Sequence, residues 1–136
     1  GDILTEPTKY INEVVTENKN FINHDVYAGP FDAKFMARNR VRGWNETSFT
    51  IQAQAKNEPL HPQAPKMIYK SQNKRIFEHL YRRLSIRECA RIQSFPDSFI
   101  FHYTNIADGY KMVGNAVPPR MAFFLAEQLK LILKRL

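Results

Sequence analysis

The clearest hydrophobic period in the chain lies at its C-terminal end. Apolar residues recur at steps of three and four positions between Pro119 and Leu136, and this spacing predicts a helix with one apolar face. The residues of that face are Met121, Phe124, Leu125, Leu129, Ile132 and Leu136. A second helix is predicted over residues 85–94, because Ser85 and Glu88 have the spacing of a capping box.

The pattern before these helices is less regular. Alternating β-branched and aromatic residues predict a strand over residues 47–53, and a second short strand is predicted at residues 67–69. The polar run 71–78 is typical of a flexible connection. Residues 8–15 have the spacing of a short helix, whereas the aromatic-rich segment 99–113 shows no clear period.

Together these elements predict an α+β chain in two parts. A small, irregular, β-rich recognition lobe is expected over residues 1–75, and a mostly helical segment over residues 76–136. A chain of 136 residues with 43% hydrophobic residues can form one domain or two small lobes, each with some core. No apolar run approaches the length of a membrane-spanning helix, and one cysteine excludes an internal disulfide.

Charge narrows the choice of partner. The formal net charge is +7 and the pI is about 9.7, a balance that favours a polyanion, with nucleic acid as the first candidate. Arg38, Arg40 and Arg42 alternate, so in a strand or an extended loop they face the same way. Arginine forks bond guanine O6 and N7, but phosphate contacts or a solvated basic edge explain the same residues.

Three stretches resemble parts of the DNA cytosine-5 methyltransferases. Residues 83–97, RLSIRECARIQSFPD, resemble motif IX of that family, and residues 114–118, GNAVP, resemble motif X. The two occur in the order and at roughly the spacing that the family uses. Residues 39–67, NRVRGWNETSFTIQAQAKNEPLHPQAPKM, resemble the target-recognition region of methylases from bacterial restriction-modification systems that read GGCC-type sites.

The resemblance implies roles for specific residues. The predicted DNA-binding residues are Arg38, Arg40, Arg42 and Lys56. Lys56 departs from the family, which has a third guanine-reading arginine at that position. The residues predicted to contact S-adenosylmethionine, in a glycine turn before the last helix, are Gly114, Asn115 and Ala116. The residues predicted to brace the recognition lobe structurally against a catalytic lobe are Arg83, Arg87, Glu88 and Arg91.

No catalytic residue is predicted in this chain. The family's nucleophile is a cysteine after a proline, whereas Cys89 follows Glu88 inside the motif IX helix, where a small packed residue is expected. The glycine-rich cofactor turn and the Glu-Asn-Val acid motif of the family are also absent from the sequence. The chain is therefore expected to be inactive alone, as the C-terminal part or the small subunit of a split methylase.

The expected partners follow from this interpretation. They are duplex DNA and a Rossmann-like catalytic lobe that carries the Pro-Cys nucleophile, against which the apolar last helix packs. The resemblance implies a cytoplasmic bacterial enzyme with neither a membrane nor a metal partner; the four histidines lack metal-ligand spacing. Two alternatives stay open: a sequence-specific DNA-binding protein without a catalytic partner, and a protein-interaction module whose basic face is incidental.

Overall fold

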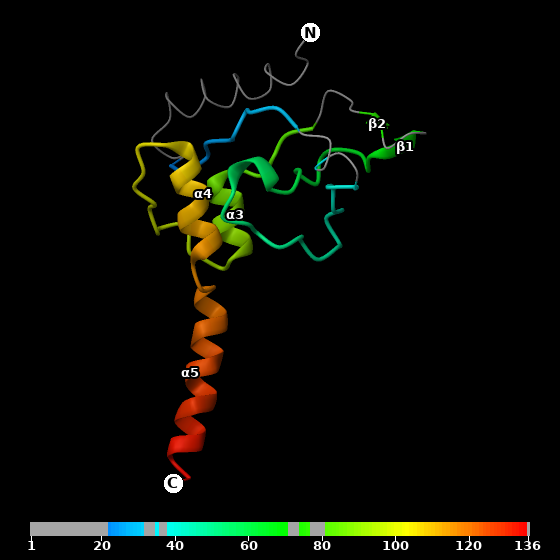
Figure 1. Ribbon diagram of the computed structural model, residues 1–136. Coiled ribbons are helices and arrows are strands. Elements are labelled where there is room, and N and C mark those ends of the chain that lie inside the picture. Colours follow the sequence, from blue (N-terminus) through cyan, green and yellow to red (C-terminus); the bar gives the residue numbers. More distant parts are fainter. Residues whose placement is uncertain (1–21, 32–34, 36–37, 71–73, 77–80, 136) are drawn as a thin grey trace.

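A computed structural model describes residues 22–31, 35, 38–70, 74–76 and 81–135 (Figure 1). The helix predicted at residues 8–15 lies outside these ranges. The elements in chain order are η1 (Ala55–Asn57), β1 (Ile68–Lys70), β2 (Lys74–Ile76), α3 (Ile86–Ile92), α4 (Ile106–Asn115) and α5 (Pro119–Leu133). None of the described helices is long and apolar enough to cross a membrane.

α3 confirms the helix predicted over residues 85–94. The Ser85 hydroxyl accepts the backbone N–H of Glu88 at 3.2 Å, and the Ser85 N–H donates to the Glu88 carboxylate at 2.8 Å. This is the capping box expected from the sequence. The helix ends after Ile92, because Ser94 adopts the left-handed backbone conformation with φ 66°.

α4 lies in a segment whose sequence shows no clear period. Its first turn is capped by Asn105, whose side chain accepts the N–H of Ala107 at 2.9 Å. Its buried residues are Gly109, Tyr110 and Val113. These three buried positions give only a weak helical period in the sequence, because the apolar aromatic residues just before the helix do not follow it. The absence of a period in residues 99–113 is therefore no guide to their structure.

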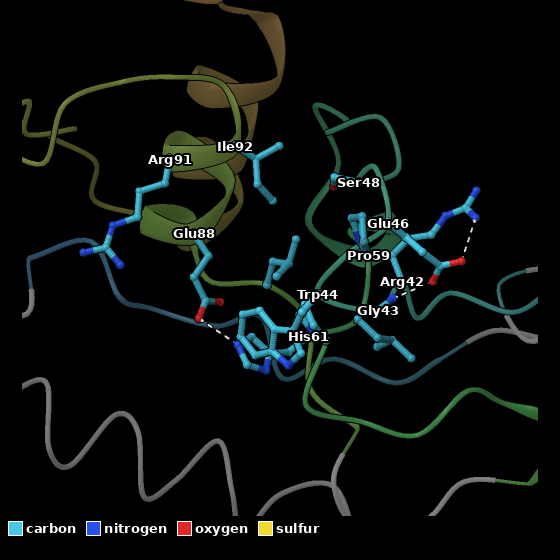
Figure 2. A pocket seen from close by; sticks show the side chains of 13 residues that line it. Arg42, Gly43, Trp44, Glu46, Ser48, Pro59, His61, Glu88, Arg91 and Ile92 are labelled. Atoms are coloured by element: carbon cyan, nitrogen blue, oxygen red, sulfur yellow. Dashed lines mark hydrogen bonds and ion pairs between the residues drawn. The ribbon is translucent and has the colours of Figure 1, made fainter.

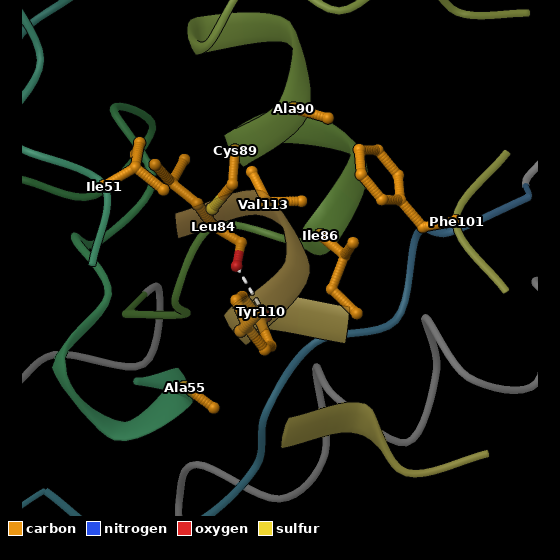
Figure 3. Packing of buried hydrophobic residues seen from close by; sticks show 9 residues of the cluster. All are labelled: Ile51, Ala55, Leu84, Ile86, Cys89, Ala90, Phe101, Tyr110 and Val113. Carbon is orange, nitrogen blue, oxygen red and sulfur yellow. Dashed lines mark hydrogen bonds between the residues drawn. The ribbon is translucent and has the colours of Figure 1, made fainter. Parts of the chain in front are cut away.

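Two hydrophobic clusters form the described interior. The larger, the helical cluster, is shown in Figure 3 and consists of Ile51, Ala55, Leu84, Ile86, Cys89, Ala90, Phe101, Tyr110 and Val113. The Tyr110 hydroxyl donates to the Leu84 carbonyl at 2.7 Å within it. The smaller, the loop cluster, consists of Phe35, Val41, Leu60, Ala64, Met67 and Tyr81. Ile51 and Ala55 come from residues 39–67, the stretch that resembles a target-recognition region and is called the recognition segment below, and they share one core with residues of α3 and α4.

The strand predicted over residues 47–53 is wrong. The structure has extended backbone there without a strand ladder. Ile51 is buried in the helical cluster, so packing rather than strand pairing accounts for this apolar position. A stretch with alternating residues becomes a strand only where a neighbouring backbone completes its hydrogen bonds.

β1 confirms the short strand predicted near residues 67–69, and β2 falls within the run predicted as a connection. The two strands are antiparallel, with Ile68 opposite Ile76. Isolated bridges also join Leu60 to Val41 and to Arg83. The helical C-terminal part is confirmed, whereas the β-rich character of the recognition lobe stays a prediction.

The glycine turn predicted before the last helix is also wrong in its local structure. Gly114 and Asn115 are the last residues of α4, and Ala116 is its C-cap. A Cβ atom at Gly114 would lie 2.4 Å from backbone atoms of both Gln52 and Ala53. Glycine is needed because the end of α4 approaches this backbone directly.

α5 confirms the predicted last helix and projects away from the remaining helices (Figure 1). None of its residues is buried, so the predicted apolar face is exposed from Met121 to Ile132, while Leu136 lies outside the described residues. Large apolar side chains are exposed outside that face as well, at Phe123, Leu131 and Leu133. A helix with apolar residues on several sides is typical of a protein interior, not of a solvated surface.

Candidate nucleic-acid interface

The three alternating arginines lie on one segment but in different surroundings. Arg38 and Arg42 are exposed, whereas Arg40 is half-buried. The Arg40 guanidinium lies 4.7 Å over the Phe35 ring, and its Nε donates to the Phe35 carbonyl at 3.1 Å. Arg40 is therefore anchored on the loop cluster, which the even spacing of the sequence did not indicate.

Arg42 is held at the surface by two contacts. Its guanidinium carbon lies 4.2 Å from the centroid of the Phe49 ring, and its Nη1 lies 3.8 Å from Glu46 Oε1. These contacts orient a side chain that stays largely exposed. A planar donor group that is already oriented loses less conformational entropy when it binds a partner.

A tight turn follows Arg42. The Glu46 N–H donates to the Gly43 carbonyl at 3.0 Å, and the Gly43 N–H donates to the Glu46 carboxylate at 2.6 Å. Lys66 adds a 3.1 Å ion pair to the same carboxylate. The hydrogen bond from Gly43, followed by that from Lys66, lowers the pKa of Glu46. The turn presents Trp44 at its tip.

Lys56 lies on a second segment, η1, with its side chain exposed. The chain after η1 joins the arginine segment, because the Leu60 N–H donates to the Arg40 carbonyl at 3.0 Å. The segment with the three arginines and the segment that follows Lys56 are therefore hydrogen-bonded to each other. The Lys56 carbonyl also accepts Arg83 Nε at 3.2 Å, so the segment is tied to the start of the motif IX region.

A cleft of about 370 Å³, the turn–helix cleft, separates the turn at residues 43–46 from α3 (Figure 2). Its lining residues are Arg42, Gly43, Trp44, Glu46, Ser48, Pro59, Leu60, His61, Pro62, Leu84, Glu88, Arg91 and Ile92. Sequence reasoning did not single out Trp44 or His61. One signal was present: the only tryptophan of the chain lies two residues after Arg42.

His61 and Glu88 form the polar floor of the turn–helix cleft. His61 Nε2 lies 3.5 Å from Glu88, while Nδ1 accepts the Gln63 N–H at 3.2 Å, which assigns the ring proton to Nε2. Burial lowers the pKa of His61, so the ring is neutral at pH 7. Burial alone would raise the pKa of Glu88, but the hydrogen bonds and charge of Arg82 and the hydrogen bond from the Ser85 N–H together outweigh burial and lower the pKa to about 2.

Arg83, one of the predicted brace residues, is only 2% exposed. Its guanidinium donates to four backbone carbonyls at 2.7–3.2 Å, those of Tyr27, Gly29, Pro30 and Lys56. It also lies 4.0 Å from the centroid of the Phe31 ring. One buried cation thereby fixes the segment at residues 27–31 beside η1.

The other two brace arginines differ from each other. Arg87 is buried and donates to the carbonyls of Ile22, Pro96 and Phe99 and to the side chain of Asn23. Arg91 is exposed and forms a bidentate pair with Asp97 at 2.7 and 2.9 Å. Arg87 therefore holds residues 22–23 and 96–99 together in the interior, whereas Arg91 forms an ion pair at the surface.

Cys89 confirms the expectation of a packed helix residue. Its sulfur is buried 3.6 Å from Glu58 Oε2. Burial raises the pKa of the Cys89 thiol well above its usual value, and it raises the pKa of Glu58 to about 8. Among the described residues, Oε1 of Glu58 has no hydrogen-bond partner. This pair is a neutral thiol beside a neutral acid at pH 7, and such a thiol is no nucleophile.

The residues predicted to contact the cofactor lie at the end of α4. Asn115 is exposed there, Ala116 is half-buried, and Gly114 packs on the recognition segment. Because the N–H of Ala116 is bonded to the Val113 carbonyl, this helix end does not present the anion-binding backbone expected of a helix start. Across the residues placed by the structure, no group of three or more His, Cys, Asp or Glu side chains could hold a metal ion.

Comparisons with known proteins identify relatives of the chain. Residues 1–131 match the profile of the family described as C-5 cytosine-specific DNA methylase. The chain is 56% identical to Type II methyltransferase M.MthTI of Methanothermobacter thermautotrophicus, over 96% of this chain and 41% of that protein. It is 50% identical to Type II methyltransferase M.FnuDI of Fusobacterium nucleatum, over 91% and 37%. The chain thus spans about two fifths of the length of these relatives.

Proposed function

The chain belongs to the C-5 cytosine-specific DNA methylase family, and on this premise we propose that it forms the DNA-recognition and cofactor-closing part of a DNA (cytosine-5-)-methyltransferase. The proposed enzyme transfers a methyl group from S-adenosylmethionine to C5 of cytosine in a GGCC-like duplex site. The observation that carries this proposal is the family match over residues 1–131. The type II methyltransferases among the relatives support it.

In this proposal Arg40 and Arg42 read guanines in the major groove. Arg42 has the suitable form, because Phe49 and Glu46 orient its fork while leaving the side chain exposed. Lys56 contributes one ammonium group at the position where the resemblance implies a third guanine-reading arginine. Arg38, exposed at the start of the same segment, completes the DNA-binding set.

The nucleophile comes from another part of the enzyme in this proposal. Cytosine-5 methylation requires a thiolate that attacks C6 of an extruded cytosine. Cys89 is unsuitable because it is buried, and burial raises its pKa. A Rossmann-like catalytic lobe with a Pro-Cys nucleophile, as a domain or as a separate subunit, would supply the thiolate. The exposed apolar residues of α5 suit a role as its packing surface.

The remaining proposed roles concern the cofactor and the brace. S-adenosylmethionine supplies the methyl group when it is bound. Asn115 and Ala116, at the accessible end of α4, fit a contact with it, and Gly114 positions them by allowing α4 to approach Gln52. Residues 1–75 form the recognition lobe and residues 76–136 the segment that returns to the catalytic lobe. Its brace residues are Arg83, Arg87, Glu88 and Arg91.

A binding experiment tests the recognition role. Fluorescence anisotropy of the 136-residue chain is measured with a duplex that contains GGCC and with duplexes in which one G·C pair is replaced by A·T. Arg42→Ala is expected to weaken binding to the GGCC duplex about 5- to 150-fold and to relax discrimination at one base pair. Lys134→Ala, which removes an exposed charge just after α5, is the matched control and is expected to change binding little.

A second experiment tests the enzymatic role. The chain is used as bait in extracts of its source cells, and the recovered complex is assayed for methyl transfer to the GGCC duplex. Recovery of a catalytic polypeptide with Pro-Cys, or of a longer chain that contains this one, together with methyl transfer, supports the proposal. DNA binding without any catalytic partner would instead indicate a stand-alone DNA-binding protein. In the binding experiment, an equal loss of affinity for Arg42→Ala on every duplex would show that Arg42 contacts phosphate rather than a base.

A further inference from the structure

Trp44 is a large aromatic side chain that the proposed roles leave unexplained. It is 74% exposed, although it is the only tryptophan of the chain. Exposure alone decides little, since single apolar residues are common on protein surfaces. Trp44 differs from the exposed residues of α5 because its position is tightly fixed and because its neighbours are charged.

Three contacts of the turn fix the backbone that carries Trp44. The carboxylate of Glu46 accepts the Gly43 N–H at 2.6 Å and the Lys66 ammonium at 3.1 Å, and the Glu46 N–H closes the turn on the Gly43 carbonyl at 3.0 Å. The indole packs against the His61 ring at a centroid distance of 5.4 Å and an angle of 86°. Figure 2 shows the two rings side by side in the lining of the turn–helix cleft.

His61 is itself a fixed support. Its Nδ1 accepts the Gln63 N–H at 3.2 Å, and its Nε2 faces Glu88 at 3.5 Å. An edge contact with this ring leaves most of the indole surface open, in agreement with the exposure of Trp44. The aromatic surface is therefore oriented in advance, so little side-chain entropy is lost when a flat partner stacks on it.

The charges around the cleft favour a nucleic acid over an apolar peptide. Two cationic side chains that line the cleft are substantially exposed, Arg42 at 44% and Arg91 at 52%, and Arg91 is paired with Asp97. The acidic residues of the lining are paired as well, Glu46 with Lys66 and Glu88 with Arg82. An open aromatic surface beside the exposed Arg42 guanidinium matches a base with its flanking phosphate.

We propose that Trp44 is a base-stacking residue, and that the turn–helix cleft receives a nucleobase unstacked from the duplex beside the guanines that Arg42 contacts. This inference rests on the proposed function, in which this surface binds DNA. Extrusion of a base breaks its pair and its stacking, so a methylase–DNA complex contains a base whose flat faces have lost their neighbours. An indole held in the lining of a cleft can replace one of them.

The experiment uses the intrinsic fluorescence of Trp44, which reports this position alone. The full chain is titrated with the GGCC duplex and with the same duplex carrying an abasic site in place of one cytosine, which leaves the opposite guanine unpaired. Stacking is expected to quench the emission, more strongly with the abasic duplex. In parallel, anisotropy with labelled duplexes gives the affinity of Trp44→Ala and Trp44→Phe.

Trp44→Ala is expected to weaken binding to the abasic duplex about 5- to 150-fold, whereas Trp44→Phe keeps an aromatic face and stays within a few-fold of the parent. Phe123→Ala, at an exposed aromatic residue of α5, is the control for loss of surface area and is expected to bind as the parent does. Circular dichroism tests whether each variant is folded. If Trp44→Ala does not fold, the affinity of Trp44→Phe and the fluorescence quenching of the parent chain test the stacking role.

The possible failures are distinguishable. If Arg42→Ala weakens binding but Trp44→Ala does not, and emission stays constant on binding, the stacking role is wrong while the proposed function stands. If the unmodified chain binds neither duplex, the proposed function fails and the stacking role fails with it. Equal affinities of the alanine and phenylalanine variants, both weaker than the parent, would also exclude a stacking role.

Discussion

The conservative change Arg83→Lys is expected to destabilise the chain far more than Arg91→Lys. Both changes keep the positive charge and replace a planar fork by a single ammonium group. Arg83 is buried and serves four backbone carbonyls, whereas Arg91 is exposed and serves one carboxylate, that of Asp97. The comparison therefore separates the geometry of the fork from the charge.

The magnitude follows from the positions of the acceptors around Arg83. Its Nε bonds to the Lys56 carbonyl, and its Nη2 to the Pro30 carbonyl, at opposite ends of the planar group. One ammonium cannot reach both, so one acceptor loses its partner, or two if the ammonium lies beside the carbonyls of Tyr27 and Gly29. A part-buried acceptor without a partner costs about 1–2 kcal/mol, which gives a loss of about 1–4 kcal/mol in the free energy of unfolding.

Urea unfolding monitored by circular dichroism measures this difference. With an m value of about 2 kcal/mol/M, Arg83→Lys should lower the urea midpoint by about 0.5–2 M. Arg91→Lys should lower it by less than about 0.5 M, because an exposed ion pair contributes little to stability. Similar shifts for both variants, or a shift below about 0.5 M for Arg83→Lys, would refute the assignment of Arg83 as the residue that fixes residues 27–31 beside η1.

Two further predictions concern the contact of α4 with the recognition segment and the buried acid. Gly114→Ala should lower the free energy of unfolding by up to about 2 kcal/mol. A clash with Gln52 costs about 1–3 kcal/mol, and the higher helix propensity of alanine offsets about 1 kcal/mol of this cost. A higher urea midpoint for the variant would contradict the close approach of α4 to Gln52. Because the pKa of Glu58 is raised from 4.5 to about 8, the folded chain retains a proton there that the unfolded chain loses. Stability should therefore fall between about pH 4.5 and 8, by at most about 1.4 kcal/mol per pH unit from this group. Glu58→Gln should remove this part of the decline in urea midpoints measured against pH; an unchanged slope would show that Glu58 ionises normally.

Sequence patterns located the elements whose signals are local. The capping box of α3 and the apolar period of α5 depend on residues three or four positions apart, so both helices could be predicted. The extended stretch before η1 could not be distinguished from a strand, because strand formation depends on a partner backbone far along the chain. The burial of Glu58 and the support of Trp44 by His61 are likewise tertiary contacts that no spacing reveals.

The packing of α4 connects the two roles proposed for this chain, DNA recognition and cofactor closure. The end of α4, which carries Asn115, packs on the backbone of Gln52 and Ala53 with no room for a side chain at Gly114. Those two residues follow the extended stretch that starts at the Arg42 turn, and Ile51 shares a core with α4. Any displacement of α4 must therefore move the backbone of the recognition segment, since close-packed contacts transmit small shifts. In the proposed enzyme, binding of the DNA site and closure at the end of α4 are thus mechanically linked through these contacts.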